Sequence, residues 1–187
     1  MRNENSRPAS ARAPRQGAPS WGPGCRRSLT VQNRQRRRGL NLRLLRQIAE
    51  ALLREAWPDG HLDLGVYVMA EAGMTRLNET FLRHHGSTDV ITFDYAEGTA
   101  HRLRQPKPTA LLYGEIFVCL DVAVRQARRF HTTWQDELVR YIVHGVLHLL
   151  GYDDLAVGPR RRMKARENAL VRELARRFDL KRLRAAG

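Results

Sequence analysis

The sequence predicts an α+β fold, a single domain in which a small mixed sheet of about four strands is covered by helices. Two observations carry this prediction. Stretches with apolar residues at every second position alternate with stretches of helical spacing, in the order β-α-β-α-β, loop, β-α-α-α. The chain of 187 residues is long enough for one domain with a proper core and too short for two ordinary domains.

The first 28 residues differ from the rest of the chain. They are rich in Pro, Gly, Ala, Ser and Arg, show no apolar periodicity, and contain Glu4 as their only acid. Such a segment cannot bury enough apolar surface to offset the entropy of ordering. We therefore expect residues 1–28 to be a disordered basic tail and residues 29–180 to form the domain. An organellar transit peptide and a start codon assigned too early are alternatives for the tail.

The first half of the domain begins with a short strand over residues 29–33. Asn41 is placed to cap a following helix, in which apolar residues recur at helical spacing from Leu45 to Ala56. Pro58, Asp59 and Gly60 end that helix. Strict alternation over residues 62–70 then predicts the next strand.

The middle of the chain contains shorter elements. A short helix is expected within residues 71–85, with Met74, Leu77 and Phe81 facing inward. A β-branched strand follows over 88–93, then a loop over 96–112 and a strand over 113–118.

Three helices are expected in the last part of the chain. The first spans 121–130, with Ala123, Ala127 and Phe130 along its apolar line. The second runs from about 133 to 150, and its second half is apolar nearly all round, as in a helix buried at the centre of a domain. The third starts at Gly158-Pro159, with proline in a tolerated first-turn position.

The charge balance is the outlier of the composition. The chain carries 33 Lys+Arg against 19 Asp+Glu, a net charge of +14. Such an excess predicts attraction to polyanions, nucleic acid first and anionic membrane surfaces second. The base composition of the genome is an alternative explanation for the enrichment in arginine. Cys25 and Cys119 imply no disulfide framework, and no apolar run approaches the roughly 18 residues that span a bilayer. We expect a soluble, cytoplasmic protein with no membrane partner.

The long helix carries a pair of histidines with the spacing of a metal chelate. His144 and His148 stand four residues apart, so both imidazoles project from one helix face. Gly151 directly follows the helix and predicts a left-handed cap that reverses the chain. The turn could bring Asp153 or Asp154 over the imidazoles, which would give three protein ligands and the open fourth position of a catalytic zinc site. The alternative is that the two histidines bind no metal and are simply packed and hydrogen-bonded.

The helix is zincin-like in its length and its two ligands, but it lacks the glutamate of the H-E-x-x-H motif. Gly145 stands at that position, so a metalloprotease of the usual mechanism would have no general base.

The stretch from His144 to Asp154, H-G-V-L-H-L-L-G-Y-D-D, resembles the H-G-x-L-H-L-x-G-Y-D-H signature of the YbeY family of metal-dependent endoribonucleases. Two metal-binding histidines of the family fall on His144 and His148. The third falls on Asp154, where this chain departs from the pattern. Aspartate is a competent zinc ligand, so the resemblance implies one Zn2+ or another divalent metal on His144, His148 and Asp154, with Asp153 bracing the turn.

Two further segments resemble the same family. The run L-N-E-T-F-L-R-H-H-G-S-T-D-V-I-T-F is similar to its L-N-x-x-x-R and T-D-V-L-S-F blocks, and places Arg83 at the arginine implicated in RNA binding and cleavage. Tyr113 to Val118 resembles the L-G-D-I-x-I segment, with Glu115 at its acidic position. Glu115 could orient a histidine or act as a base, but an acid on an edge strand is usually exposed, so it is left outside the catalytic set of Arg83, His144 and His148.

The resemblance implies a single-strand-specific endoribonuclease in ribosomal RNA processing, maturation and ribosome quality control. Its partners would be a ribosomal RNA precursor and the small ribosomal subunit or its proteins. The metal would serve to activate a water or a ribose 2′-hydroxyl, or to polarise the phosphate, and Arg83 would hold that phosphate. The main alternative is a ribosome-associated RNA-binding assembly factor with a structural or vestigial metal site. A metal-dependent hydrolase with another substrate is a second alternative, which the net charge of +14 disfavours.

Overall fold

A computed structural model describes residues 27–96 and 111–185 of the chain. The expected tail, apart from Arg27 and Ser28, and most of the expected loop over 96–112 lie outside these residues. Arg27 and Ser28 form the start of the first strand, and the folded part continues past residue 180 to a short helix with Leu183 fully buried. The strands are β1 (Arg27–Asn33), β2 (His61–Met69), β3 (Val90–Asp94) and β4 (Leu111–Cys119), and the helices are α1 (Leu42–Ala56), α2 (Glu71–Leu77), the π-helix Asn78–Leu82, α3 (Leu120–Phe130), α4 (Trp134–Leu149), α5 (Val157–Arg177) and the 3-10 helix Leu180–Leu183.

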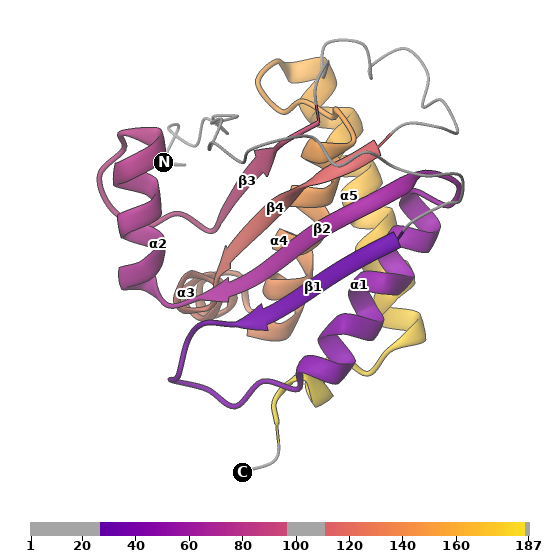
Figure 1. Cartoon of the computed structure of the whole chain (residues 1–187). Coiled ribbons are helices and arrows are strands. Elements are labelled where there is room, and N and C mark those ends of the chain that lie inside the picture. Colours follow the sequence, from indigo (N-terminus) through magenta and orange to yellow (C-terminus); the bar gives the residue numbers. More distant parts are fainter. Residues whose placement is uncertain (1–26, 97–110, 186–187) are drawn as a thin grey trace.

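The four strands form one mixed sheet, as predicted. Their order is β1-β2-β4-β3, with β1, β2 and β4 parallel and β3 antiparallel to β4 (Figure 1). The parallel pairs are joined by crossovers, of which the first is α1. The expectation that Glu115 sits on an edge strand is wrong, because β4 lies between β2 and β3.

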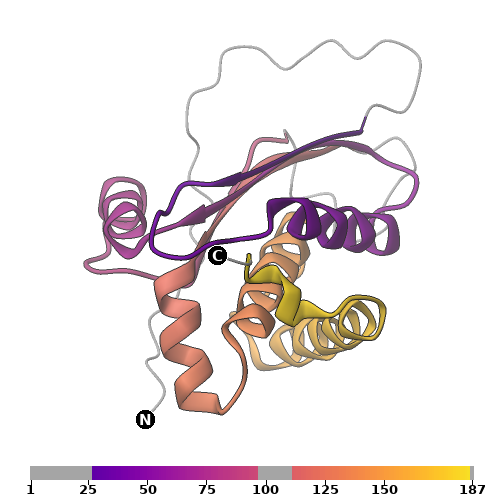
Figure 2. The same ribbon diagram turned by 90° about the horizontal axis from the view of Figure 1, so that it is seen from below.

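Helices α1 and α4 cover one face of the sheet, α5 packs against the outer side of these two helices, and α2 lies at one end of the sheet (Figure 2). The strands follow the two-residue period, so that Leu64 and Val66 of β2 face the main core while Tyr67 joins a smaller cluster on the other side. Ile116 and Phe117 of β4 divide in the same way. The main core thus lies between the sheet and helices α1 and α4, and it continues between these helices and α5.

Two aromatic side chains that were expected to face inward are exposed. Phe81 is 39% exposed and Phe130 is 59% exposed, so both expectations are wrong. Helix α2 continues as a π-helix from Asn78, which changes the angular spacing of the residues and turns Phe81 away from the buried Met74. Phe130 is the last residue of α3, just before the left-handed His131 ends the helix.

Helix α4 is the buried centre of the domain, as its apolar sequence predicted. Thr133 and Asp136 form a capping box at its start. Gly145 lies against β4, where a Cβ atom would come within 2.7 Å of the Ile116 side chain. A glutamate would not fit at this position, so close packing on the sheet explains the glycine.

The structure confirms the predicted N-cap of the first helix. The Asn41 side chain accepts a hydrogen bond from the Leu44 amide at 3.0 Å and caps α1. Among the helices described, none combines the length and the apolar character needed to cross a bilayer.

Candidate metal centre and adjoining cleft

His144 and His148 point toward each other from consecutive turns of α4. Their Nε2 atoms are 3.0 Å apart, and the two rings are nearly perpendicular. Both side chains are largely buried, with 25% of His144 and 13% of His148 exposed. The four-residue spacing therefore brings two imidazole nitrogens to one point, as predicted.

The turn after α4 also fixes the orientation of His148. Gly151 adopts the predicted left-handed conformation, with φ of 85°. The Gly151 amide donates to the His148 carbonyl at 2.9 Å and the Tyr152 amide donates to the Leu147 carbonyl at 3.0 Å, which together form a Schellman motif. The Tyr152 carbonyl in turn lies 3.1 Å from Nδ1 of His148. Because a carbonyl can only accept, Nδ1 carries the proton and Nε2 keeps its lone pair.

The same turn brings Asp154 to the histidines and leaves Asp153 outside. One Asp154 oxygen lies 3.9 Å from Nε2 of His144, and the other lies 3.9 Å from Nε2 of His148. Oδ1 of Asp154 is buried and has no hydrogen-bond partner among the described residues. Asp153 instead accepts a hydrogen bond from the Leu155 amide at 2.9 Å and braces the turn, as expected.

His144 is oriented by Glu167, a residue that sequence reasoning missed. Oε2 of Glu167 lies 3.0 Å from Nδ1 of His144, while Oε1 accepts from Arg140 at 2.7 Å and from Lys164 at 2.6 Å. Burial alone would raise the pKa of Glu167, but the hydrogen bonds from His144, Lys164 and Arg140 outweigh it and lower the pKa to about 2. The carboxylate is thus ionised, Nδ1 of His144 is its donor, and Nε2 of His144 is the ring nitrogen that faces His148.

A signal for Glu167 was present in the sequence. Glu167 lies four residues after Met163 and three before Leu170, and both of these are buried on the inner face of α5. An acid on an apolar helical stripe is rarely buried without a partner. The apolar face of α5 could therefore have identified Glu167 as a buried acid, but it could not have identified His144 as its partner.

These residues fit a metal ion by the chemistry of their donor atoms. Two imidazole nitrogens that face each other at 3.0 Å need a proton or a metal ion between them, and the buried Oδ1 of Asp154 lacks a donor. Nitrogens bound about 2.0–2.1 Å from one tetrahedral zinc would lie about 3.3 Å apart, close to the observed separation. Burial and the neighbouring His144 lower the pKa of His148, which favours the neutral ring that a metal requires. Among the described residues, His144, His148 and Asp154 form the cluster that could hold a metal, with donor atoms within 4.8 Å of one another.

Arg83 and Glu115 lie away from this cluster. Arg83 follows the π-helix, has a φ of 55°, and is exposed. It does not line the cleft that opens at the histidines. Glu115 accepts hydrogen bonds from Tyr67 at 3.2 Å and Tyr95 at 2.7 Å, so the orienting role considered for it belongs to Glu167.

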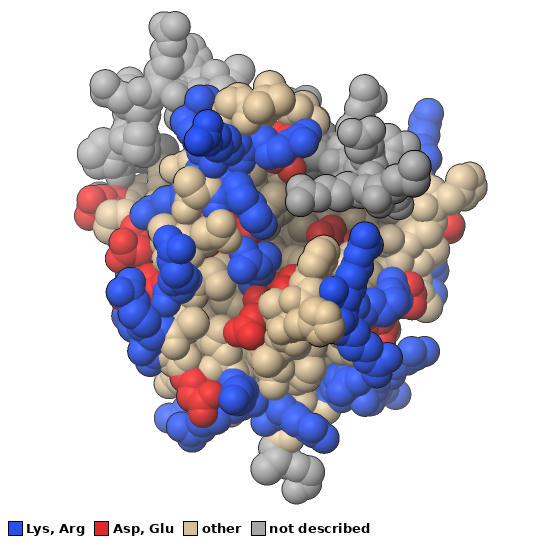
Figure 3. All heavy atoms as spheres, turned by 180° about the vertical axis from the view of Figure 1, so that it is seen from behind, with Lys and Arg blue, Asp and Glu red and all other residues tan. Residues whose placement is uncertain are grey.

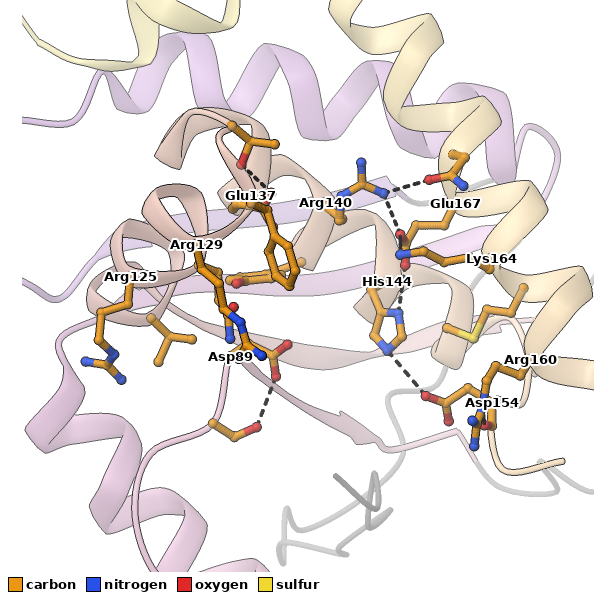
Figure 4. A pocket seen from close by; sticks show the side chains of 18 of the residues that line it. Asp89, Arg125, Arg129, Glu137, Arg140, His144, Asp154, Arg160, Lys164 and Glu167 are labelled. Carbon is orange, nitrogen blue, oxygen red and sulfur yellow. Dashed lines mark hydrogen bonds and ion pairs between the residues drawn. The ribbon is translucent and has the colours of Figure 1, made fainter. Parts of the chain in front are cut away.

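The metal cluster opens into a cleft of about 870 Å³ between α3, α4 and α5. Figure 4 shows His144 between Glu167 and Asp154 at one end, with Arg129 and Asp89 at the other. Its lining contains five cationic side chains, Arg125, Arg129, Arg140, Arg160 and Lys164, and four acidic ones, Asp89, Glu137, Asp154 and Glu167. On the face opposite the view of Figure 1, Lys and Arg side chains surround a smaller number of acids (Figure 3).

Comparison with known proteins identifies the same family along most of the chain. The sequence profile of the family Endoribonuclease YbeY matches residues 30–175. Proteins named Endoribonuclease YbeY from Chlorobium luteolum and Bordetella pertussis are 41% and 36% identical, over 54% and 68% of this chain and 66% and 78% of their own lengths. The chain thus spans somewhat under two thirds of the Chlorobium protein. The solution structure of TM1509 from Thermotoga maritima matches the fold, with a TM-score of 0.58 and 24% identity over 84% of this chain and 96% of that one.

Proposed function

The chain belongs to the YbeY family of endoribonucleases, and on this premise we propose that it is a zinc-dependent endoribonuclease that cuts single-stranded RNA. The proposal extends to its role. The enzyme acts in the cytoplasm on a ribosomal RNA precursor, in maturation and ribosome quality control, with the small ribosomal subunit or its proteins as a partner.

The convergence of three donor atoms on one point carries the proposal. Nε2 of His144, Nε2 of His148 and the partnerless Oδ1 of Asp154 come together at one end of the cleft, which His144 and Asp154 line. Three protein ligands leave a position open for a reacting group, as in catalytic zinc sites. A bound zinc ion supplies Lewis acidity for activating a water or a ribose 2′-hydroxyl and for polarising a phosphate.

The protein groups around the cluster have separate tasks. Glu167 holds the ring and tautomer of His144, and the Tyr152 carbonyl does the same for His148. Arg83 binds the scissile phosphate and stabilises the negative charge that develops on it. Arg83 is exposed and lies outside the cleft in this structure, so its side chain must move to the metal cluster when RNA is bound.

The cationic surface suits an RNA substrate. Five cationic side chains line the cleft against four acidic ones, and the whole chain carries a net charge of +14. Phosphate neutralisation by Lys and Arg makes such binding depend steeply on salt.

Cleavage of a precursor of small-subunit ribosomal RNA tests the proposal. The purified protein is compared with His148→Ala and with His131→Ala, an exposed histidine outside the cleft, each prepared identically to reveal contaminating nuclease. We expect the wild type and His131→Ala to cut, and His148→Ala to bind RNA without cutting. Equal cleavage by all three would refute a metal-site nuclease. Binding without cleavage by any of them would favour an assembly factor whose metal site is structural or vestigial.

A further inference from the structure

Two buried polar atoms in the cleft, beyond the metal cluster, lack a hydrogen-bond partner. Tyr141 is 6% exposed, and its hydroxyl has no partner among the residues described. Oε1 of Gln126 is also buried and also lacks a hydrogen-bond partner among the described residues. Both residues line the cleft, Gln126 from α3 and Tyr141 from α4. Buried polar groups nearly always have partners, so two orphans in one cleft indicate that a ligand supplies them.

The two atoms have defined hydrogen-bonding roles. Burial raises the pKa of the Tyr141 phenol, with smaller contributions from Asp89 and Glu137, so the hydroxyl stays protonated and can donate. The Gln126 oxygen accepts. A ligand that fits must therefore offer a group able to donate and a group able to accept, and a single hydroxyl can do both.

Phe130 and Arg129 of α3 line the same cleft as these two atoms, together with the carboxylates of Asp89 and Glu137. Phe130 is 59% exposed and lines the cleft, and the Arg129 guanidinium lies 5.6 Å from the centre of its ring. Arg129 makes no ion pair with any residue in the ranges 27–96 and 111–185, whereas Arg125 is paired with Glu71 at 2.7 Å. An exposed aromatic ring next to an unpaired guanidinium is the arrangement that binds unstacked nucleotides.

We propose that this part of the cleft is a subsite for one unpaired ribonucleotide next to the scissile phosphate. Phe130 stacks on the base and Arg129 contacts a flanking phosphate. Tyr141 donates to a ribose hydroxyl or to an acceptor atom of the base, and Gln126 accepts from a ribose hydroxyl or from a base amine. The assignment rests on the proposed function, because it takes RNA to be the substrate held at the metal cluster. Beyond the proposed function, the subsite identifies the residues that bind the nucleotide next to the scissile phosphate.

The Tyr141→Phe substitution tests the subsite, because it removes only the orphan hydroxyl. The zinc-loaded full chain is titrated into a labelled six-nucleotide single-stranded RNA, with binding read by fluorescence anisotropy and the oligonucleotide checked for integrity on a gel. We expect affinity to fall about 3- to 10-fold, the size of one hydrogen bond. The melting temperature should not fall, since the hydroxyl has no partner within the protein. Tyr113→Phe, outside the cleft, is the matched control and should bind within twofold of wild type.

A DNA strand of the same sequence identifies the group that is read. If Tyr141 contacts the ribose 2′-hydroxyl, the difference between wild type and Tyr141→Phe disappears on DNA. If it contacts a base, the difference persists on DNA and varies with base identity. Phe130→Ala should weaken binding of either strand about 10-fold, from lost stacking.

The outcomes separate this inference from the nuclease proposal. Unchanged affinity of Tyr141→Phe for both strands would overturn the subsite, even if the wild type cleaves RNA through His148. A protein that never cleaves, but loses affinity with Tyr141→Phe, would retain the subsite as an RNA-binding feature and lose the nuclease function.

Discussion

Residues predicted for the site lie at two helix ends, and the two ends differ in where they place these residues relative to the metal cluster. Gly151 ends α4 with a φ of 85°, and Arg83 ends the π-helix with a φ of 55°. Both are left-handed residues that reverse the chain. The first turn brings Asp154 back over the two histidines, whereas the second leaves Arg83 exposed and outside the cleft.

The difference lies in what holds each turn. After α4, the Schellman hydrogen bonds place the Tyr152 carbonyl on His148, and Arg160 donates to the Asp154 carbonyl at 2.8 Å. After the π-helix, the backbone N–H of Arg83 donates to the Asn78 carbonyl, and no bond of the Arg83 side chain joins it to the described cleft residues. The metal ligands are therefore preorganised by the fold, and the arginine is not. Zinc affinity should depend on the α4 turn and be insensitive to Arg83.

Asp154→Ala should have the largest effect on zinc affinity. It removes a ligand directly, so the loss should exceed the about 10- to 100-fold seen when partners of ligands are removed. Titration against a chromophoric chelator measures it. Asp153→Ala is the matched control, because Asp153 bonds only within the turn, and it should stay within a few-fold of wild type. The reverse ranking would make Asp153 the ligand.

Glu167→Gln should lower zinc affinity about 10- to 100-fold by loosening His144. It should also lower the free energy of unfolding of the metal-free protein by about 3 kcal/mol at neutral pH, because the pKa of Glu167 is about 2 in the folded protein against an ordinary value of 4.5. Because the folded-state pKa is depressed, this stabilisation is complete above pH 4.5 and is lost as the pH falls toward 2. Denaturant unfolding at several pH values measures the difference.

The control for Glu167 is Glu173→Gln, an exposed acid on the same helix that pairs with Arg176. Its effect should stay below about 1 kcal/mol. A Glu167→Gln protein that matches it in stability and zinc affinity would exclude the positioning role.

Gly151→Ala should have a smaller effect. An alanine at φ of 85° costs about 1–2 kcal/mol of stability, and the displaced turn should lower zinc affinity by about 10-fold or less. Gly158→Ala is the matched control, since a Cβ there would meet only Arg162, at 3.7 Å. Equal zinc affinities for the two variants would show that the turn does not position Asp154.

Arg83→Gly should not change zinc affinity. Glycine adopts the left-handed conformation readily, so stability should also stay within about 1 kcal/mol of wild type. RNA cleavage should nevertheless fall at least about 10-fold if Arg83 binds the phosphate, and Arg83→Lys should restore part of it. Cleavage that survives Arg83→Gly would remove the arginine from the catalytic set.

Features encoded by local spacing could be predicted from the sequence. The four-residue interval of His144 and His148 and the glycine after the helix are short-range rules, and the structure follows both. The cap of α1 by Asn41 was predictable for the same reason, because it depends only on neighbouring residues. The strand patterns also predicted a mixed sheet with parallel and antiparallel pairs.

Features that depend on tertiary contacts could not be predicted. Glu167 reaches His144 from another helix, 23 residues along the chain, and no local pattern gives that pairing. The order of the strands placed Glu115 inside the sheet rather than at its edge. The change to a π-helix at Asn78 exposed Phe81, which a regular helical period would bury.

The central claim is that two imidazoles of α4 and the carboxylate of the following turn bind one metal ion. X-ray absorption at the zinc edge, on protein loaded with one equivalent of Zn2+, tests it most directly. We predict two imidazole nitrogens and oxygen ligands at about 2.0–2.2 Å, with one nitrogen lost in His148→Ala. A sulfur ligand at about 2.3 Å, or a spectrum unchanged by His148→Ala, would contradict the claim.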